Sequence, residues 1–192
     1  MTTNLYELPG DLPVPVDDGA ADHLLGLPIP PIELMSTADR TVNLAEVSKQ
    51  QRTVVYCYPM TGAPGQQLPA GWDEIPGARG CTPQSCSFRD HYDELRVLDA
   101  LVFGLSTQTT EYQQEMAQRL SLPFEVLSDA DLAFTRALGL PTFEVESRIL
   151  IRRLTLILSR AEIVKVFYPV FPPDKNAEEV IAWLSVGRRG KS

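Results

Sequence analysis

The sequence predicts an α/β fold in which a mainly parallel central sheet carries helices on both faces and an antiparallel hairpin near the C-terminus. Apolar runs rich in β-branched residues recur along the chain, as expected of strands buried on both faces. Segments with apolar residues at three- and four-residue spacing separate these runs and indicate amphipathic helices. Strands that alternate with helices favour parallel pairing, because a parallel crossover needs a connection of helix length.

The expected strands share short apolar sequences bounded by polar or turn residues. The clearest is TVVYCY at residues 53–58, which lacks polar alternation and so indicates a fully buried strand. A short hairpin is expected before it, at residues 32–36 and 41–44. Two later runs repeat the buried pattern, at residues 101–106 and 124–127. Two adjacent strands are expected near the end, at residues 154–158 and 163–168.

The expected helices follow from apolar periodicity and from capping residues. From Pro83 onward, an apolar stripe runs through Phe88, Tyr92 and Leu95, with Thr82 as a plausible N-cap and proline at the first helical position. Further helices are expected at residues 111–120, 131–138 and 174–184. This order of elements is compatible with a thioredoxin-like fold.

The chain suits one domain of ordinary size. Residues 1–25 are rich in Pro, Asp and Gly and predict an irregular N-terminal arm, residues 26–186 predict the folded domain, and residues 187–192 predict a short tail. No run approaches the ~20 apolar residues of a membrane span, and the N-terminus lacks a secretory pattern. We therefore expect a cytoplasmic protein.

The chain is acidic, with a net charge of −8. Such a surface repels phosphate backbones and anionic membranes, which makes nucleic acid and lipid poor candidate partners. The 3 cysteines cannot form a closed disulfide framework, so the alternatives are catalytic, metal-binding or inert thiols.

The position of each cysteine separates these alternatives. Cys57 lies within the buried strand and is expected to be a core side chain. Cys81 comes directly before the predicted helix, where unpaired N–H groups favour a thiolate. Cys86 follows five positions later, which in an intact helix separates the two Cα atoms by roughly 8–9 Å. A disulfide between them would require the first turn to unwind.

An irregular segment at residues 59–80, with four prolines and five glycines, leads into Cys81. A loop of this length inside a compact domain is unusual and is often functional. Because prolines lower the entropy cost of ordering, we expect a packed loop at the active site, pinned by Trp72 and Ile75.

The sequence GCTPQSCSFRDHY at residues 80–92 resembles the reactive helix of peroxiredoxins of the bacterioferritin-comigratory, or Q-type, group. That group reads Gly-Cys-Thr-x-Glu-Ala-Cys-x-Phe-Arg-Asp, with Tyr-Pro after an earlier buried strand. Further matches are Tyr58-Pro59, Leu127-Ser128-Asp129 and the RLTLI run at residues 153–157. The resemblance extends over residues 26–184.

The resemblance implies a thiol-dependent peroxidase of the atypical 2-Cys type with a thioredoxin fold. Cys81 would attack the hydroperoxide and become a sulfenic acid, and Cys86 would resolve it as an intrachain disulfide. Arg153 would stabilise the thiolate, and Gln84 stands where the family has a glutamate that orients this arginine. Thioredoxin or a similar dithiol would reduce the disulfide, in a monomer or homodimer, and no metal, flavin or haem cofactor is implied.

One departure from the family pattern concerns the hydroxyl group that holds the peroxide. The pattern Pro-x-x-x-Thr-x-x-Cys places a threonine three residues before the cysteine, where this chain has Ala78. Pro59 precedes Cys81 by 22 residues instead of 7, so the loop carries 15 extra residues. Thr61 and Thr82 are the two candidate replacements.

Three other functions compete with peroxide reduction. A redox-sensing interaction protein with little peroxidase turnover is the main alternative, because the family threonine is missing. A protein disulfide oxidoreductase is disfavoured by the lack of Cys-x-x-Cys. A zinc site that includes His91 is disfavoured by the ligand spacing.

Overall fold

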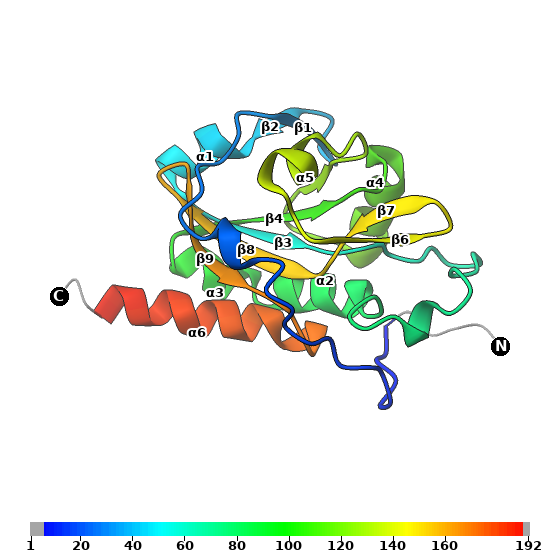
Figure 1. The fold of residues 1–192 in the computed structure, drawn as a ribbon. Helices are drawn as coiled ribbons and strands as arrows, with labels where there is room; N and C mark the ends of the chain where they lie inside the picture. The colour runs from blue at the N-terminus through cyan, green and yellow to red at the C-terminus, as the bar shows by residue number, and fades with distance from the viewer. Residues whose placement is uncertain (1–5, 190–192) are drawn as a thin grey trace.

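The computed structural model describes residues 6–189, and the side chains of residues 6–186. The first five residues of the predicted arm and the last three of the predicted tail lie outside this range. Within it, a seven-stranded sheet has the order β2-β1-β5-β4-β3-β8-β9, and β6 and β7 form a separate pair (Figure 1). The strands are β1 Glu33–Ser36, β2 Thr41–Asn43, β3 Arg52–Cys57, β4 Ala100–Ser106, β5 Val126–Ser128, β6 Thr142–Val145, β7 Arg148–Ile151, β8 Leu154–Ser159 and β9 Glu162–Phe167.

The centre of the main sheet is parallel, and its flanks are antiparallel. Strand β4 pairs in parallel with β3 on one side and with β5 on the other. Strand β8 adds antiparallel to β3, and β9 to β8, which confirms the C-terminal hairpin. The N-terminal hairpin β1–β2 joins the opposite edge through an antiparallel pairing of β1 with β5.

Helices cover both faces of the sheet, as predicted. Helices α1 and α5 share a buried apolar cluster with one face, and α2, α3, α4 and α6 share another cluster with the opposite face. Figure 1 shows α1 and α5 above the sheet and α2, α3 and α6 below it. Their bounds are α1 Leu44–Gln50, α2 Cys81–Asp90, α3 Tyr92–Val97, α4 Thr110–Leu120, α5 Ala133–Leu138 and α6 Asn176–Arg189, with single 3-10 turns at η1 Asp22–Leu24, η2 Trp72–Glu74 and η3 Pro173–Lys175.

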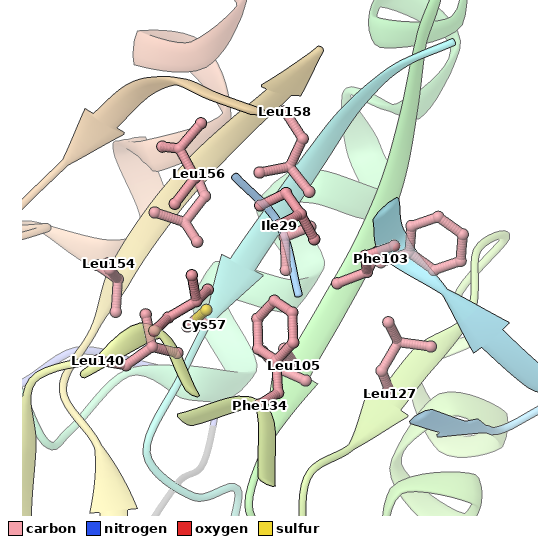
Figure 2. Close-up of a cluster of buried hydrophobic side chains, with 14 of the residues drawn as sticks. Ile29, Cys57, Phe103, Leu105, Leu127, Phe134, Leu140, Leu154, Leu156 and Leu158 are labelled. Carbon is pink, nitrogen blue, oxygen red and sulfur yellow. The ribbon is translucent and has the colours of Figure 1, made fainter. Parts of the chain in front are cut away.

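Strand β3 contributes to both clusters because successive side chains point to opposite faces. Tyr56 packs into the cluster beneath α2, whereas Val55 and Cys57 pack into the cluster beneath α5. Figure 2 shows Cys57 surrounded by Leu140, Leu154 and other apolar side chains. Burial raises the pKa of the Cys57 thiol, with a smaller contribution from Asp129. The expected core position of Cys57 is confirmed.

Two parts of the fold differ from the sequence prediction. The single helix expected from Pro83 through Leu95 is divided at His91, whose backbone is non-helical, into α2 and α3. The apolar stripe runs unbroken through Tyr92 and therefore gave no sign of the break. Helix α1 and the β6–β7 hairpin were not predicted. No helix in the described part of the chain has the length and apolar character to cross a membrane.

Candidate active site

Cys81 is the first residue of α2. The prediction that Thr82 caps this helix is wrong, because Gly80 holds the N-cap position with a φ of 103°. The carbonyl of Gly80 accepts the first helical hydrogen bond, 3.0 Å from the amide nitrogen of Gln84. Pro83 lies within the first turn, where its missing N–H costs nothing. The Cys81 side chain therefore lies beside the positive end of the helix dipole.

Position 80 favours glycine for two reasons, its backbone conformation and the atoms that surround it. Its positive φ is rarely adopted by residues with a side chain. A Cβ atom at this position would also collide with Pro173 of η3 and with Leu8 of the N-terminal arm. The start of α2 is therefore enclosed by two segments that are distant from it in sequence.

Arg153 links the thiol of Cys81 to the backbone that leads into α2. This side chain is 3 % exposed and lies between β7 and β8. Its Nη2 atom lies 3.2 Å from the Sγ atom of Cys81, and the guanidinium also donates to the carbonyls of Gly77, Ala78 and Arg79 at 3.3, 3.1 and 3.1 Å. One cation thus fixes the sulfur and the three residues that lead to Gly80.

Gln84 orients the arginine from within α2. Its Oε1 accepts a hydrogen bond from Nη1 of Arg153, and its Nε2 donates to Oδ1 of Asn176 at 3.0 Å. The same Asn176 oxygen accepts from Thr155 of β8 at 2.6 Å. Gln84, Thr155 and Asn176 are all fully buried. The amide that replaces the family glutamate therefore acts as an acceptor toward Arg153 and as a donor toward α6.

Cys81 lines a small chamber of about 10 Å³. Thr61 and Thr82 both line it. The Thr61 hydroxyl donates to Oε1 of Gln108 at 3.2 Å, so its proton is already committed. Within residues 6–189, the Thr82 hydroxyl has no hydrogen-bond partner, and no hydrogen bond joins Thr61 to Cys81. The structure brings both threonines to the chamber and leaves the Thr82 hydroxyl free.

Cys86 lies away from this chamber, in the next turns of α2. Its half-buried side chain packs against the apolar cluster that includes Phe88. Burial raises the pKa of the Cys86 thiol, while the nearby Arg89 opposes the shift. Phe88 stacks on Tyr56 with ring centroids 4.5 Å apart, and Tyr56 donates to Ser85 at 3.1 Å. These contacts hold the middle of α2 to the sheet.

The inserted loop is packed, as predicted. Trp72 is 3 % exposed, and its ring lies 6.2 Å from that of Phe143 in β6. Ile75 packs against the same small apolar cluster, which the β6–β7 hairpin completes. Arg79 forms an ion pair with Asp73 at 3.3 Å across the loop. The loop and the hairpin therefore stabilise each other, and both Trp72 and Arg79 line the Cys81 chamber.

Three residues of this site were missed by the sequence analysis. Arg79 is a second buried arginine at the chamber, and its place two residues before Cys81 was the available signal. Asn176 and Gln108 have no local signal, because their contacts with Gln84 and Thr61 join segments 92 and 47 residues apart. Among the described residues, no group of three His, Cys, Asp or Glu side chains is placed to hold a metal ion.

The sequence of this chain matches a known protein family. The Redoxin family profile matches residues 24–181. The chloroplastic peroxiredoxin Q of Sedum lineare is 31 % identical over 156 residues, which is 81 % of this chain and 74 % of the relative. The peroxiredoxin bcp1 of Schizosaccharomyces pombe is 28 % identical over 65 % of this chain and 57 % of its own length.

Solved structures show the same fold at lower identity. Peroxidoxin BcpB of Mycobacterium tuberculosis is 21 % identical with a TM-score of 0.69, covering 84 % of this chain and 96 % of that protein. Peroxiredoxin Q of Xylella fastidiosa is 20 % identical with a TM-score of 0.69, over 85 % and 96 %. The thioredoxin-like fold is thereby confirmed. The chain belongs to the peroxiredoxin Q group of the Redoxin family, and its family chemistry is thiol-dependent reduction of peroxide.

Proposed function

We propose that this protein reduces small hydroperoxides through Cys81, is resolved by Cys86, and is regenerated by thioredoxin or a similar dithiol. The observation that carries the proposal is the 3.2 Å contact between Nη2 of Arg153 and Sγ of Cys81 at the first residue of α2. A buried guanidinium and a helix N-terminus both favour negative charge on the sulfur.

In the first step, the Cys81 thiolate attacks one oxygen of the hydroperoxide. The O–O bond breaks, the sulfur becomes a sulfenic acid, and the second oxygen leaves as an alcohol or water after it takes up a proton. Nη2 of Arg153 is placed to stabilise the charge that moves from sulfur to oxygen. The Thr82 hydroxyl is the first candidate to hold the peroxide oxygens, because the Thr61 hydroxyl already donates to Gln108, and Thr61 is the alternative.

In the second step, the Cys86 thiolate attacks the sulfenic sulfur. An S–S bond forms, the S–O bond breaks, and the sulfenic oxygen leaves as hydroxide, which takes up a proton to become water. Because Cα atoms five residues apart in a helix are roughly 8–9 Å apart, the first turn of α2 must unwind. Phe88 and Ser85 are held to Tyr56, so the unwinding is confined to the residues between Gly80 and Gln84.

In the third step, a dithiol reduces the Cys81–Cys86 disulfide by exchange and leaves as its own disulfide. The 3 cysteines cannot form a closed disulfide framework, which suits a reducing compartment, and we propose the cytoplasm. We propose a monomer or homodimer, with neither nucleic acid nor membrane as a partner.

The test is peroxide consumption with a thioredoxin system, measured for the wild type and for Cys81→Ser and Cys86→Ser. Wild type should turn over, Cys81→Ser should consume no peroxide, and Cys86→Ser should consume one equivalent and retain a sulfenic acid that dimedone traps. Near wild-type turnover in Cys81→Ser would refute the proposal. A single equivalent consumed by wild type, without turnover, would instead favour the redox-sensing alternative.

A further inference from the structure

We propose that the inserted loop makes this peroxidase selective for hydrogen peroxide over bulky hydroperoxides, with Leu68 and Met60 as the side chains that exclude the larger substrates. The inference rests on the proposed function, since it concerns which peroxides reach Cys81. It depends on two cavities that the loop forms and on the partition between them.

The inner cavity is the Cys81 chamber. Its volume of about 10 Å³ matches the space occupied by about one water molecule. Cys81 itself is only 3 % exposed. Hydrogen peroxide, with two oxygen atoms, enters such a space with little rearrangement. A hydroperoxide that carries a branched alkyl or aryl group on its oxygen does not fit.

The large apolar side chains that line the chamber come from the insertion and its borders. Leu68 and Trp72 belong to the inserted loop, and Met60 lies where the loop begins. Trp72 is fixed by Phe143, and the Asp73–Arg79 ion pair ties the end of the loop to its middle. The cover over Cys81 is therefore a packed structure anchored on the β6–β7 hairpin.

An outer cavity of about 370 Å³ lies on the other side of this cover. Its walls are residues 66–69 of the loop, Tyr112 of α4, and Ile149 with its neighbours in β7. Met60, Gly62 and Leu68 line both cavities. Space for an alkyl or aryl group thus exists close to the thiol, and the side chains of Met60 and Leu68 separate it from the sulfur. Gly62 contributes no side chain to this partition.

Met60 and Leu68, whose side chains form the partition, differ in how firmly the surrounding residues hold them. Met60 is buried, and its sulfur accepts a contact from Nη1 of Arg148 at 3.5 Å. Leu68 is half-buried and packs at the edge of the loop cluster. Shortening Leu68 removes the partition with the smaller cost in packing, which makes it the better position to test.

The experiment compares kcat/KM for hydrogen peroxide and for cumene hydroperoxide, with thioredoxin as reductant. Wild type should prefer hydrogen peroxide by about 100-fold, the scale on which a shaped apolar pocket discriminates. Leu68→Ala should join the two cavities and raise the ratio of cumene hydroperoxide to hydrogen peroxide activity by about tenfold. Ile149→Ala is the matched control, because Ile149 lines only the outer cavity and is 41 % exposed. This variant should keep the wild-type ratio.

The outcomes separate failure of the selectivity inference from failure of the proposed peroxidase function. Comparable wild-type kcat/KM for the two peroxides would overturn the inference while supporting the proposed function. A selective wild type whose ratio is unchanged in both Leu68→Ala and Met60→Ala would also overturn it. Inactivity of folded wild type toward both peroxides would contradict the proposed function itself. Circular dichroism of each variant establishes that the ratio is measured on folded protein.

Discussion

The Nη2 atom of Arg153 lies 3.2 Å from the sulfur of Cys81 and 3.1 Å from the carbonyl oxygens of both Ala78 and Arg79. The arginine that faces the thiol therefore also holds the end of the inserted loop. In the proposed cycle, oxidation of the sulfur removes the charged partner of Arg153, and the segment that must move for resolution is the one that Arg153 holds. The proposed cycle therefore couples charge at the sulfur to mobility of the first turn of α2 through one side chain.

Arg153→Lys should lower the rate constant for oxidation of Cys81 by about 100-fold, because an ammonium cannot reproduce the planar fork that contacts the sulfur, Gln84 and three carbonyls. Stopped-flow mixing with hydrogen peroxide measures this rate. The control is Arg152→Lys, at the adjacent position, whose side chain is 43 % exposed and pairs with Asp18. Equal losses in the two variants would show that Arg153 has no special role at the sulfur.

Disulfide formation should accelerate with pH. The pKa of Cys86 is raised above its ordinary value of 9.0, mainly by burial, so the thiol is protonated at pH 7. Its thiolate fraction, and with it the rate of attack on the sulfenic acid, should rise by about tenfold per pH unit from pH 7 to 9. Acid-quenched samples analysed by mass spectrometry give this rate. A rate independent of pH would mean that unwinding of α2, rather than deprotonation of Cys86, limits resolution.

Thr82→Val should lower kcat/KM for hydrogen peroxide by about fivefold, as expected for the loss of one hydrogen bond of ~1 kcal/mol in the transition state. Thr61→Val should have the smaller effect, because the Thr61 hydroxyl is bonded to Gln108. Steady-state kinetics on both variants decide between the two hydroxyls. A larger loss in Thr61→Val would assign the peroxide contact to Thr61.

Gly80→Ala should lower the free energy of unfolding by about 2–4 kcal/mol, since it combines backbone strain with overpacking against Pro173 and Leu8. Urea denaturation followed by circular dichroism measures the change. Gly10→Ala is the control, because no atom of the described residues, its chain neighbours aside, lies within 4 Å of the added methyl group, and it should change stability by less than ~0.5 kcal/mol. A neutral Gly80→Ala would show that the start of α2 readily adjusts its path.

The sequence predicted those parts of the fold whose signal is local. Strands β3, β4 and β8 were predicted because they are buried on both faces and are therefore apolar throughout. Strands β6 and β7 were missed because they are short, mixed in burial pattern and stabilised largely by Trp72 and the rest of the inserted loop. Their stability depends on a tertiary contact that no local pattern reports.

The same distinction applies to the site. Cys81, Cys86, Gln84 and Arg153 were predicted from a local motif and a matching late strand, and the structure brings Cys81, Gln84 and Arg153 into contact. The capping role of Gly80 was missed because Thr82 and Pro83 are good helix-start residues, and the close approach of Pro173 to Gly80 joins segments that are distant in sequence. The engagement of Thr61 by Gln108 could not be predicted, because it depends on how the loop folds back onto α4.

The N-terminal arm packs against the segment that leads into α2. Leu8 lies against Gly80, Pro15 lies near Gly77, and Asp18 bonds to Tyr168 and Arg152. All of these contacts precede residue 24, where the match to the family begins. A protein shortened to the family boundary would lose the apolar covering of the segment that Arg153 clamps. We therefore expect the minimal catalytic unit to be longer than the region of sequence similarity, which truncations on either side of Leu8 would test.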